Sequence, residues 1–282
     1  FEVLPVARRA PTTMPLPGFD DAEVRALLES QGAVFTQGSV PTISWPTDQP
    51  VADPALFAER DDYRISPPDG AADASEWDRF WRYRALSQNV GLDLTPTLEA
   101  VFVRYLLRLS RPEVVDRSAR ILCVGNGLSL LPHALSELGF SVSVLELSNQ
   151  AVQIGLAQAP SRPQLEPLLK LVADEMGSLL QPDGSVLWVE GDLFDPSVCL
   201  GLYDIIVVTR VLEGMSDFDI QVAATRLDAR LAPDGWCWVA VQNSGFKWIA
   251  VQRAFDAAGV AVVPYDELPE HGKAMAGGLT SA

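Results

Sequence analysis

Two glycines follow a buried, strand-like run of the sequence, and a loop at this position could bind a nucleotide-sized ligand. Gly125 and Gly127 come directly after the run RILCV, and glycine lets a backbone turn sharply and approach a ligand closely. No Lys or Arg lies between Arg120 and Arg162, so the lysine of a phosphate-binding P-loop is missing. Leu130 replaces the third glycine of the dinucleotide fingerprint GxGxxG. These differences favour a ligand without phosphate.

The pattern that remains is GxGxS, the loop type that cradles S-adenosyl-L-methionine. This cofactor carries a sulfonium and no phosphate, so its loop requires no basic residue. A GxG pattern alone is also common in turns that bind no ligand. Other residues must therefore decide between these two interpretations.

Acidic residues follow two further strand-like runs. Glu146 ends the run SVSVLE, nineteen residues after Gly127, and a carboxylate there can accept both hydroxyl hydrogens of a ribose. Alternatively, Glu146 is an acid at the start of the next helix. Asp192 ends the run WVEGD beside Gly191. It could address an adenine ring, or it could be an ordinary turn residue.

A fourth run, YDIIVVT, carries polar residues at both ends. Thr209, Arg210 and Glu213 lie at or just after its carboxyl end, where ligands bind in parallel sheets. Asp204 lies at its amino end, which favours a structural role. Arg210 and Glu213 are the candidates for catalysis, and the sequence identifies no general base.

Alternating strand and helix patterns position these residues. Such alternation predicts an α/β fold with a doubly wound, mostly parallel, Rossmann-like sheet and helices on both faces. The expected strands are 119–125, 141–147, 185–192, 203–209, 236–243 and 260–265. The expected helices are 128–139, 149–159, 164–180, 217–231 and 247–258. We expect residues 118–282 to form this domain.

Residues 1–117 are rich in proline and are predicted to form an irregular, partly helical cap. The first eighteen residues are expected to be extended, and 37–70 to be mostly loop. Helices are expected from Asp20 or Asp21 to about Ser30, from near Ser75, and over 97–109.

One helix of this cap has an aromatic face. Trp77, Phe80, Trp81 and Arg84 recur at helical spacing. This face could pack the cap onto the sheet, or it could form a lid with an aromatic wall against an apolar acceptor. In the second case Trp77, Trp81 and Tyr83 would bind substrate.

Composition excludes several classes of partner. The formal net charge is −16, which disfavours nucleic acid and anionic membrane surfaces. The three cysteines have no CxxC spacing, so we expect no metal site and reduced, buried thiols in a cytoplasmic protein. Residue 1 is Phe and not Met, so a targeting segment upstream of Phe1 stays open.

Five segments in this order resemble the class I S-adenosylmethionine-dependent methyltransferases: ILCVGNGLS, SVSVLELSNQAV, VEGDLF, YDIIVVTRVL and LAPDGW. Within that superfamily, ELS, GDLF and the Arg after the fourth strand resemble the thiopurine methyltransferase-like branch. The resemblance implies an enzyme that transfers a methyl group from S-adenosyl-L-methionine to a small-molecule acceptor. It implies the cofactor-binding residues Gly125, Asn126, Gly127, Glu146, Leu147, Asp192, Leu193, Thr209 and Arg210.

The chain also departs from the family pattern. Cys123 lies two places before the first glycine, where an acidic residue is frequent, and Thr209 replaces an Asp of the branch. These departures keep open a non-catalytic, methyltransferase-like binding or scaffold domain. A protein-directed methyltransferase is a further alternative, while Leu130 argues against a nicotinamide oxidoreductase. The oligomeric state and the acceptor atom are not encoded in these motifs.

Overall fold

The computed structural model describes residues 13–15, 21–37, 42–44, 54–69, 72–86, 118–125, 129, 131–158, 184–198, 201–209, 211–240 and 245–260. Its main sheet has five strands in the order β6-β5-β4-β7-β8. They are β4 (Arg120–Val124), β5 (Ser141–Glu146), β6 (Ser185–Glu190), β7 (Tyr203–Thr209) and β8 (Leu231–Ala240). All neighbouring pairs are parallel, which confirms the expected α/β architecture.

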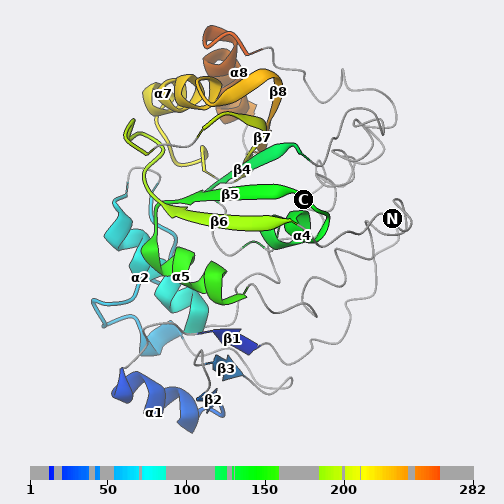
Figure 1. Ribbon diagram of the computed structural model, residues 1–282. Coiled ribbons are helices and arrows are strands. Elements are labelled where there is room, and N and C mark those ends of the chain that lie inside the picture. The colour runs from blue at the N-terminus through cyan, green and yellow to red at the C-terminus, as the bar shows by residue number, and fades with distance from the viewer. Residues whose placement is uncertain are drawn as a thin grey trace, which may run out of the picture.

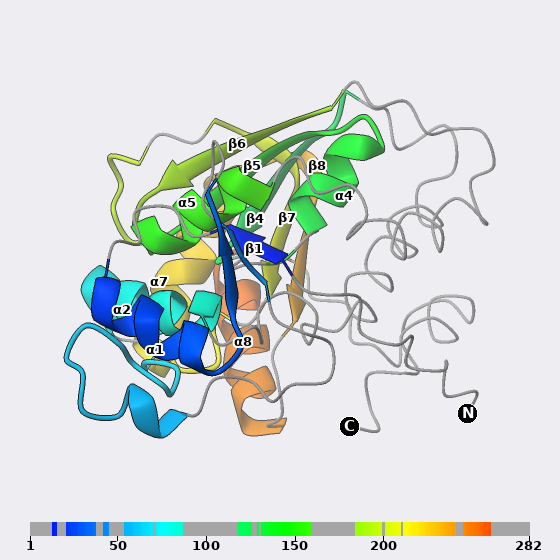
Figure 2. The ribbon, with the colours of Figure 1, turned by 90° about the horizontal axis from the view of Figure 1, so that it is seen from below.

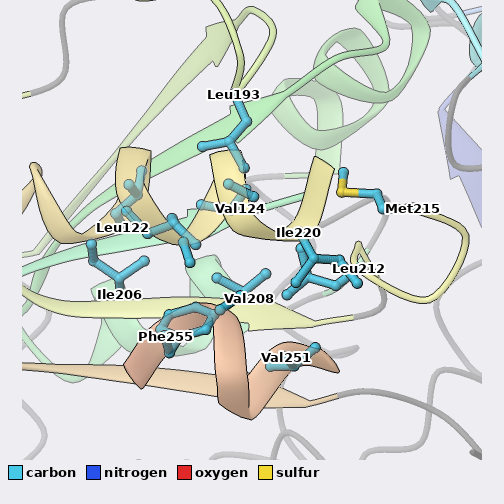
Figure 3. Packing of buried hydrophobic residues seen from close by; sticks show 14 of the residues in the cluster. Leu122, Val124, Leu193, Ile206, Val208, Leu212, Met215, Ile220, Val251 and Phe255 are labelled. Atoms are coloured by element: carbon cyan, nitrogen blue, oxygen red, sulfur yellow. The ribbon is translucent and has the colours of Figure 1, made fainter. Parts of the chain in front are cut away.

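Each central strand divides its side chains between two cores because successive residues point to opposite faces of a sheet. In β4, Ile121 and Cys123 belong to one core, and Leu122 and Val124 belong to the other. Strand β7 alternates in the same way. Figure 3 shows the second of these cores. Burial on both faces explains why the runs Ile121–Val124 and Ile205–Val208 within these strands are apolar.

Helices cover the two faces of the sheet (Figure 1). On one face lie α4 (Leu131–Glu137) and α5 (Asn149–Gln158), and on the other lie α7 (Asp217–Asp228) and α8 (Gly245–Ala257). The first four expected strands are confirmed to within two residues. Expected helices 97–109 and 164–180 lie outside the described residues, as does the final expected strand beyond residue 260.

The start of β8 differs from the expectation. Helix α7 ends at Asp228, not at Leu231, and Leu231 already pairs with Tyr203. The next pairs join Ile205 to Trp236, so the segment PDG forms an irregularity within the strand instead of a turn before it. Strand pairing begins this early because the backbone N–H of Tyr203 donates to Arg230 O at 2.8 Å.

The N-terminal cap contains α1 (Ala22–Ser30), α2 (Ala74–Leu86) and a short 3-10 turn, Pro54–Leu56. Asp21 begins α1 by accepting the Val24 N–H at 2.9 Å, as expected, and Gly32 follows its end with φ 95°. The cap also forms an antiparallel sheet in the order β1 (Thr13–Pro15), β3 (Thr42–Ser44), β2 (Val34–Thr36). The sequence did not indicate β3 within the stretch 37–70, which was expected to be mostly loop, because a three-residue strand is too short to show a periodic pattern.

Helix α5 lies between the main sheet and the cap (Figure 2). Its Ala151 and Ile154 join a core cluster with cap residues such as Leu28, Phe57 and Leu86. The same helix approaches the sheet so closely that a Cβ on Gly155 would lie 2.3 Å from the Trp188 ring. The cap therefore reaches the sheet through α5.

Candidate cofactor-binding site

The acidic and glycine residues singled out by the sequence lie at one edge of the sheet. Gly125, Glu146 and Asp192 lie at or just beyond the carboxyl ends of β4, β5 and β6, and Thr209 ends β7. Two backbone hydrogen bonds join these ends: Gly125 N–H to Leu145 O at 2.9 Å, and Gly191 N–H to Glu146 O at 3.0 Å. Chain order reverses between β4 and β7, so this edge holds the topological switch point where α/β sheets bind ligands.

Gly125 makes the turn that the sequence predicted. It has φ +61°, a conformation that L-residues rarely adopt, and a Cβ there would lie 2.1 Å from Val211 Cγ2. The glycine is therefore required by the protein's own packing against the segment after β7. Asn126, Gly127 and Arg210 lie outside the described residues.

Ser129 is the serine of the GxGxS pattern. Its side chain is buried and accepts the N–H of Leu131 at 3.1 Å. It therefore satisfies the N–H of the first residue of α4, the helix that follows the glycine turn. This contact explains the spacing of the pattern without a ligand.

Glu146 is a buried carboxylate at the end of β5, with 5% of its surface exposed. Its Oε1 accepts the backbone N–H of Ser148 at 3.3 Å. The hydroxyl of Ser148 caps α5 by accepting the Ala151 N–H at 3.2 Å. Ser148 is therefore the residue that caps α5. Glu146 lies three residues before the first helical residue, Asn149, so the alternative of an acid at the start of the next helix also fits this position. The N–H of Ser148 supplies a hydrogen bond to this buried carboxylate, as the burial of a charged group requires.

The segment after β6 places two candidates in different surroundings. Asp192 is exposed, and its Oδ1 accepts the Phe194 N–H at 2.9 Å, which is the turn that the sequence allowed as an alternative. Leu193 is buried and points into the core that includes Val124 (Figure 3). That burial makes Leu193 a packing residue, while Leu147 is half-buried beside Glu146.

Glu213 and Thr209 lie on the other side of β4. Thr209 is the last residue of β7 and pairs with Ala240 of β8. Glu213 is half-buried in the segment between β7 and α7. Both are therefore at the sheet edge that carries Gly125 and Glu146.

The aromatic residues of α2 divide between two surroundings. Trp77 and Trp81 are half-buried and stack, with ring centroids 6.4 Å apart and planes inclined by 24°. Phe80 contacts both of them edge to face. Tyr83 is buried with its ring 5.2 Å from Phe57, so it belongs to the core of the cap. This placement makes Tyr83 a packing residue. Trp81 also packs against that core, although only partly buried, whereas Trp77 is not part of it.

Asp78, on the same helix, is a residue that the sequence did not single out for the site. Its Oδ1 accepts the Ser148 hydroxyl at 2.6 Å and the Gln150 N–H at 3.0 Å. These partners lie about seventy residues further along the chain. Neither periodicity nor a local motif signals a contact over that distance.

Comparison with protein-family models gives no match, and comparison with curated proteins gives none. Solved structures with some similarity include S-adenosylmethionine-dependent methyltransferases. A TehB-like methyltransferase of this kind from Corynebacterium glutamicum is 19% identical with a TM-score of 0.41, over 64% of this chain and 82% of that one. Magnesium protoporphyrin IX methyltransferase from Synechocystis, crystallised with its cofactor, is 14% identical with a TM-score of 0.40, over 60% of this chain and 70% of that one.

An amino pentose methyltransferase from Micromonospora echinaspora is 19% identical, with a TM-score of 0.34 over 55% of this chain and 54% of that one. Similarity at this level assigns neither family nor activity. The fold rests on the strand order and register, and the functional argument rests on the residues at the sheet edge.

The cysteines of the described residues are unreactive by environment. Cys123 and Cys237 form no disulfide, and burial raises the pKa of Cys237 to about 12. A thiol with so high a pKa stays protonated and is a poor nucleophile at neutral pH. Cys123 is buried, as expected, whereas Cys237 is half-buried as a whole residue. Cys199 lies outside the described residues. Within the described ranges, no cluster of His, Cys, Asp or Glu suits a metal ion, and no helix is long and apolar enough to cross a membrane.

His133 of α4 is buried under α5. Its Nε2 lies 3.1 Å from Gly155 O, and its ring lies 6.0 Å from that of Trp188. Burial lowers its pKa below the ordinary value of 6.5, and the hydrogen bond to Gly155 opposes this only in part. These contacts support the structural role that the sequence indicated.

The low pKa of His133 predicts a loss of stability in mild acid. The unfolded chain takes up the proton first as pH falls, so the free energy of unfolding should be fully retained above about pH 6.5 and decrease below it. Urea unfolding from about pH 7.5 to 5 measures this. His133→Gln should flatten the dependence of the unfolding free energy on pH. The control is His271→Gln, at the other of the two histidines in the sequence. An unchanged slope in His133→Gln would contradict the assignment.

Proposed function

We propose that the chain is an S-adenosylmethionine-dependent methyltransferase that acts on a small-molecule acceptor. The observation that carries this proposal is the placement of Glu146. Its buried carboxylate ends β5, next to the glycine turn of β4 and at the switch point of the sheet. A carboxylate there can accept the two hydroxyl hydrogens of a ribose.

The residues present fit this cofactor by their chemistry. The stretch from Ile121 to Ser161 carries no Lys or Arg, which suits a ligand without phosphate. Gly125, Asn126 and Gly127 would hold its amino acid part, Glu146 and Leu147 its ribose, and Asp192 with Leu193 its adenine. The exposed carboxylate of Asp192 is more accessible for contact with the adenine than the buried side chain of Leu193 is.

The cofactor would supply an activated methyl group on its sulfonium. The task of the chain is then to hold an acceptor nucleophile about 3 Å from that carbon, in line with the leaving sulfur. A soft nucleophile such as a thiolate needs no general base, whereas a phenol or amine needs at most a positioned acceptor for its proton. Arg210 and Glu213 are our candidates for orienting the acceptor or taking that proton.

The acceptor is proposed to bind against α2. Trp77 and Trp81 offer half-buried, stacked rings of the type that lines apolar ligand sites. In this proposal residues 1–117 form the acceptor-side cap and 118–282 the cofactor domain. The motifs ELS and GDLF, with Arg210, support a place in the thiopurine methyltransferase-like branch. The free thiols of Cys123 and Cys237 support the proposal that the protein acts in a reducing compartment such as the cytoplasm.

Binding of the cofactor and of its demethylated product, S-adenosylhomocysteine, tests the proposal by calorimetry. Wild type should bind both at micromolar concentration. Glu146→Ala should bind at least about tenfold more weakly, which is about 1.4 kcal/mol, because the ribose hydroxyls lose their acceptor. Asp228→Ala is the control, since Asp228 is an exposed acid at the far end of α7.

Thermal unfolding of each variant verifies that it is folded before binding is measured. A folded wild type that binds neither compound would overturn the proposal and favour a non-catalytic, methyltransferase-like scaffold domain. Equal affinity of Glu146→Ala and wild type would remove Glu146 from the site. With binding established, methylation of basic peptides and not of small thiols or phenols would favour the protein-directed alternative, in line with the net charge of −16.

A further inference from the structure

Helix α2 of the cap is hydrogen-bonded to the loop that carries the candidate ribose acceptor. Asp78 Oδ1 accepts two hydrogen bonds, from the Ser148 hydroxyl at 2.6 Å and from the Gln150 N–H at 3.0 Å. Gln150 is in the first turn of α5, whose N–H groups have no partner within the helix. The carboxylate of Asp78, on α2, thus completes the N-terminal cap of α5, which is distant from it in sequence. Its negative charge is stabilised by the positive end of the α5 dipole.

Ser148 connects this contact to Glu146. The residue is completely buried, and its hydroxyl donates to Asp78 while accepting the Ala151 N–H at 3.2 Å. Its backbone N–H donates to Glu146 Oε1 at 3.3 Å. Since one residue bonds both carboxylates, a shift of Ser148 would alter the direction in which Glu146 presents its oxygens.

We propose that Asp78 is a positioning residue for cofactor binding: by holding Ser148 it orients Glu146, and it thereby couples the cap to the affinity of the site. This inference rests on the proposed function. It has a consequence for the acceptor, since Trp77 and Trp81 lie on the same helix as Asp78. An acceptor bound against these rings and a cofactor bound at Glu146 should each strengthen the binding of the other, by the same factor.

Calorimetric titration of S-adenosylhomocysteine into the full chain tests the proposal with Asp78→Ala. We expect its affinity to fall by about fivefold or more, the size of coupling found between hydrogen-bonded neighbours. Asp78→Asn keeps an oxygen that accepts both hydrogen bonds and should recover most of the affinity. Ser148→Ala should weaken binding of S-adenosylhomocysteine similarly. The double variant Asp78→Ala with Ser148→Ala should bind it with an affinity no lower than that of the single variant that binds less tightly.

Glu76→Gln is the matched control, because Glu76 lies on the same helix and pairs with Arg64 within the cap. Its affinity should equal that of wild type. Hydrogen exchange of the ligand-free protein gives a second measurement, in which the amides of Gln150 and Ala151 should exchange faster in Asp78→Ala. A purely structural role for Asp78 would speed exchange and lower stability without changing the affinity.

The outcomes separate the two proposals. If wild type binds and Asp78→Ala binds equally well, the positioning role is wrong and the proposed function stands. Equal weakening by Glu76→Gln would also overturn it, because the effect would then come from loosening of the cap in general. If folded wild type does not bind, the proposed function fails and the role of Asp78 fails with it.

Discussion

Gly125→Ala is expected to lower the free energy of unfolding by about 2–5 kcal/mol. Two costs add. A left-handed backbone conformation costs an L-residue about 1–2 kcal/mol, and Gly125 has φ +61°. The new methyl group would also lie 2.1 Å from Val211 Cγ2, and overpacking of this kind costs about 1–3 kcal/mol. Urea unfolding followed by tryptophan fluorescence measures the change.

A second substitution separates the two costs. Val211→Ala removes the methyl group that blocks the new side chain, so the double variant Gly125→Ala with Val211→Ala should recover the steric part and retain the backbone part. The single variant Val211→Ala measures the stability that is lost with the packing of the Val211 side chain itself. If the double variant is no more stable than the sum of the single changes predicts, the contact with Val211 is not the source of the strain. Because Val211 follows β7, recovery would show that the glycine turn and the segment after β7 are packed as one unit.

Ile206→Ala is expected to destabilise the protein by about 2–5 kcal/mol, the range measured for buried Ile or Leu cut back to Ala. Ile206 is completely buried in β7, between β4 and β8, and faces the core formed with α7 and α8. Its position in the middle of the sheet gives neighbouring groups little freedom to close the cavity. Chemical denaturation measures the loss, and Ile206→Val should lose only about 0.5–1.5 kcal/mol.

Phe218→Ala is the control for this prediction. Phe218 lies on α7 with 73% of its surface exposed, so its removal should change stability by less than about 0.5 kcal/mol. A loss of several kcal/mol at Phe218 would mean that the core does not lie where the structure places it. Affinity for S-adenosylhomocysteine should be unchanged in folded Ile206→Ala, because Ile206 is three residues short of the end of β7.

Much of the main sheet could be predicted from the sequence alone. Apolar runs bounded by turn residues marked the strands ending in Val124, Glu146, Glu190 and Thr209. The signal is strongest in the central strands β4 and β7, because burial on both faces favours apolar residues at successive positions. Parallel strands have their carboxyl ends at one edge, so the polar residues after each run were expected to lie together. Gly125, Glu146 and Asp192 do lie at this edge. Their binding of a cofactor stays a prediction.

Only the tertiary structure showed how these residues are held. It placed Tyr83 in the core of the cap, directed Leu193 into the main core, and set Val211 against Gly125. It also brought Asp78 to Ser148, a contact between segments seventy residues apart.

The physical reason is the range over which each interaction acts. Periodicity records which face of a local element is buried, because that pattern repeats within a few residues. Which element covers that face depends on how whole helices and strands pack, and a single hydrogen bond such as Asp78 to Ser148 leaves no repeating pattern in either segment. The sequence by itself therefore determined the first four strands of the main sheet, the polar residues at their carboxyl ends and the candidate residues among them. The packing of the cap on α5 decided that Asp78 of the cap contacts Ser148, which in turn bonds Glu146.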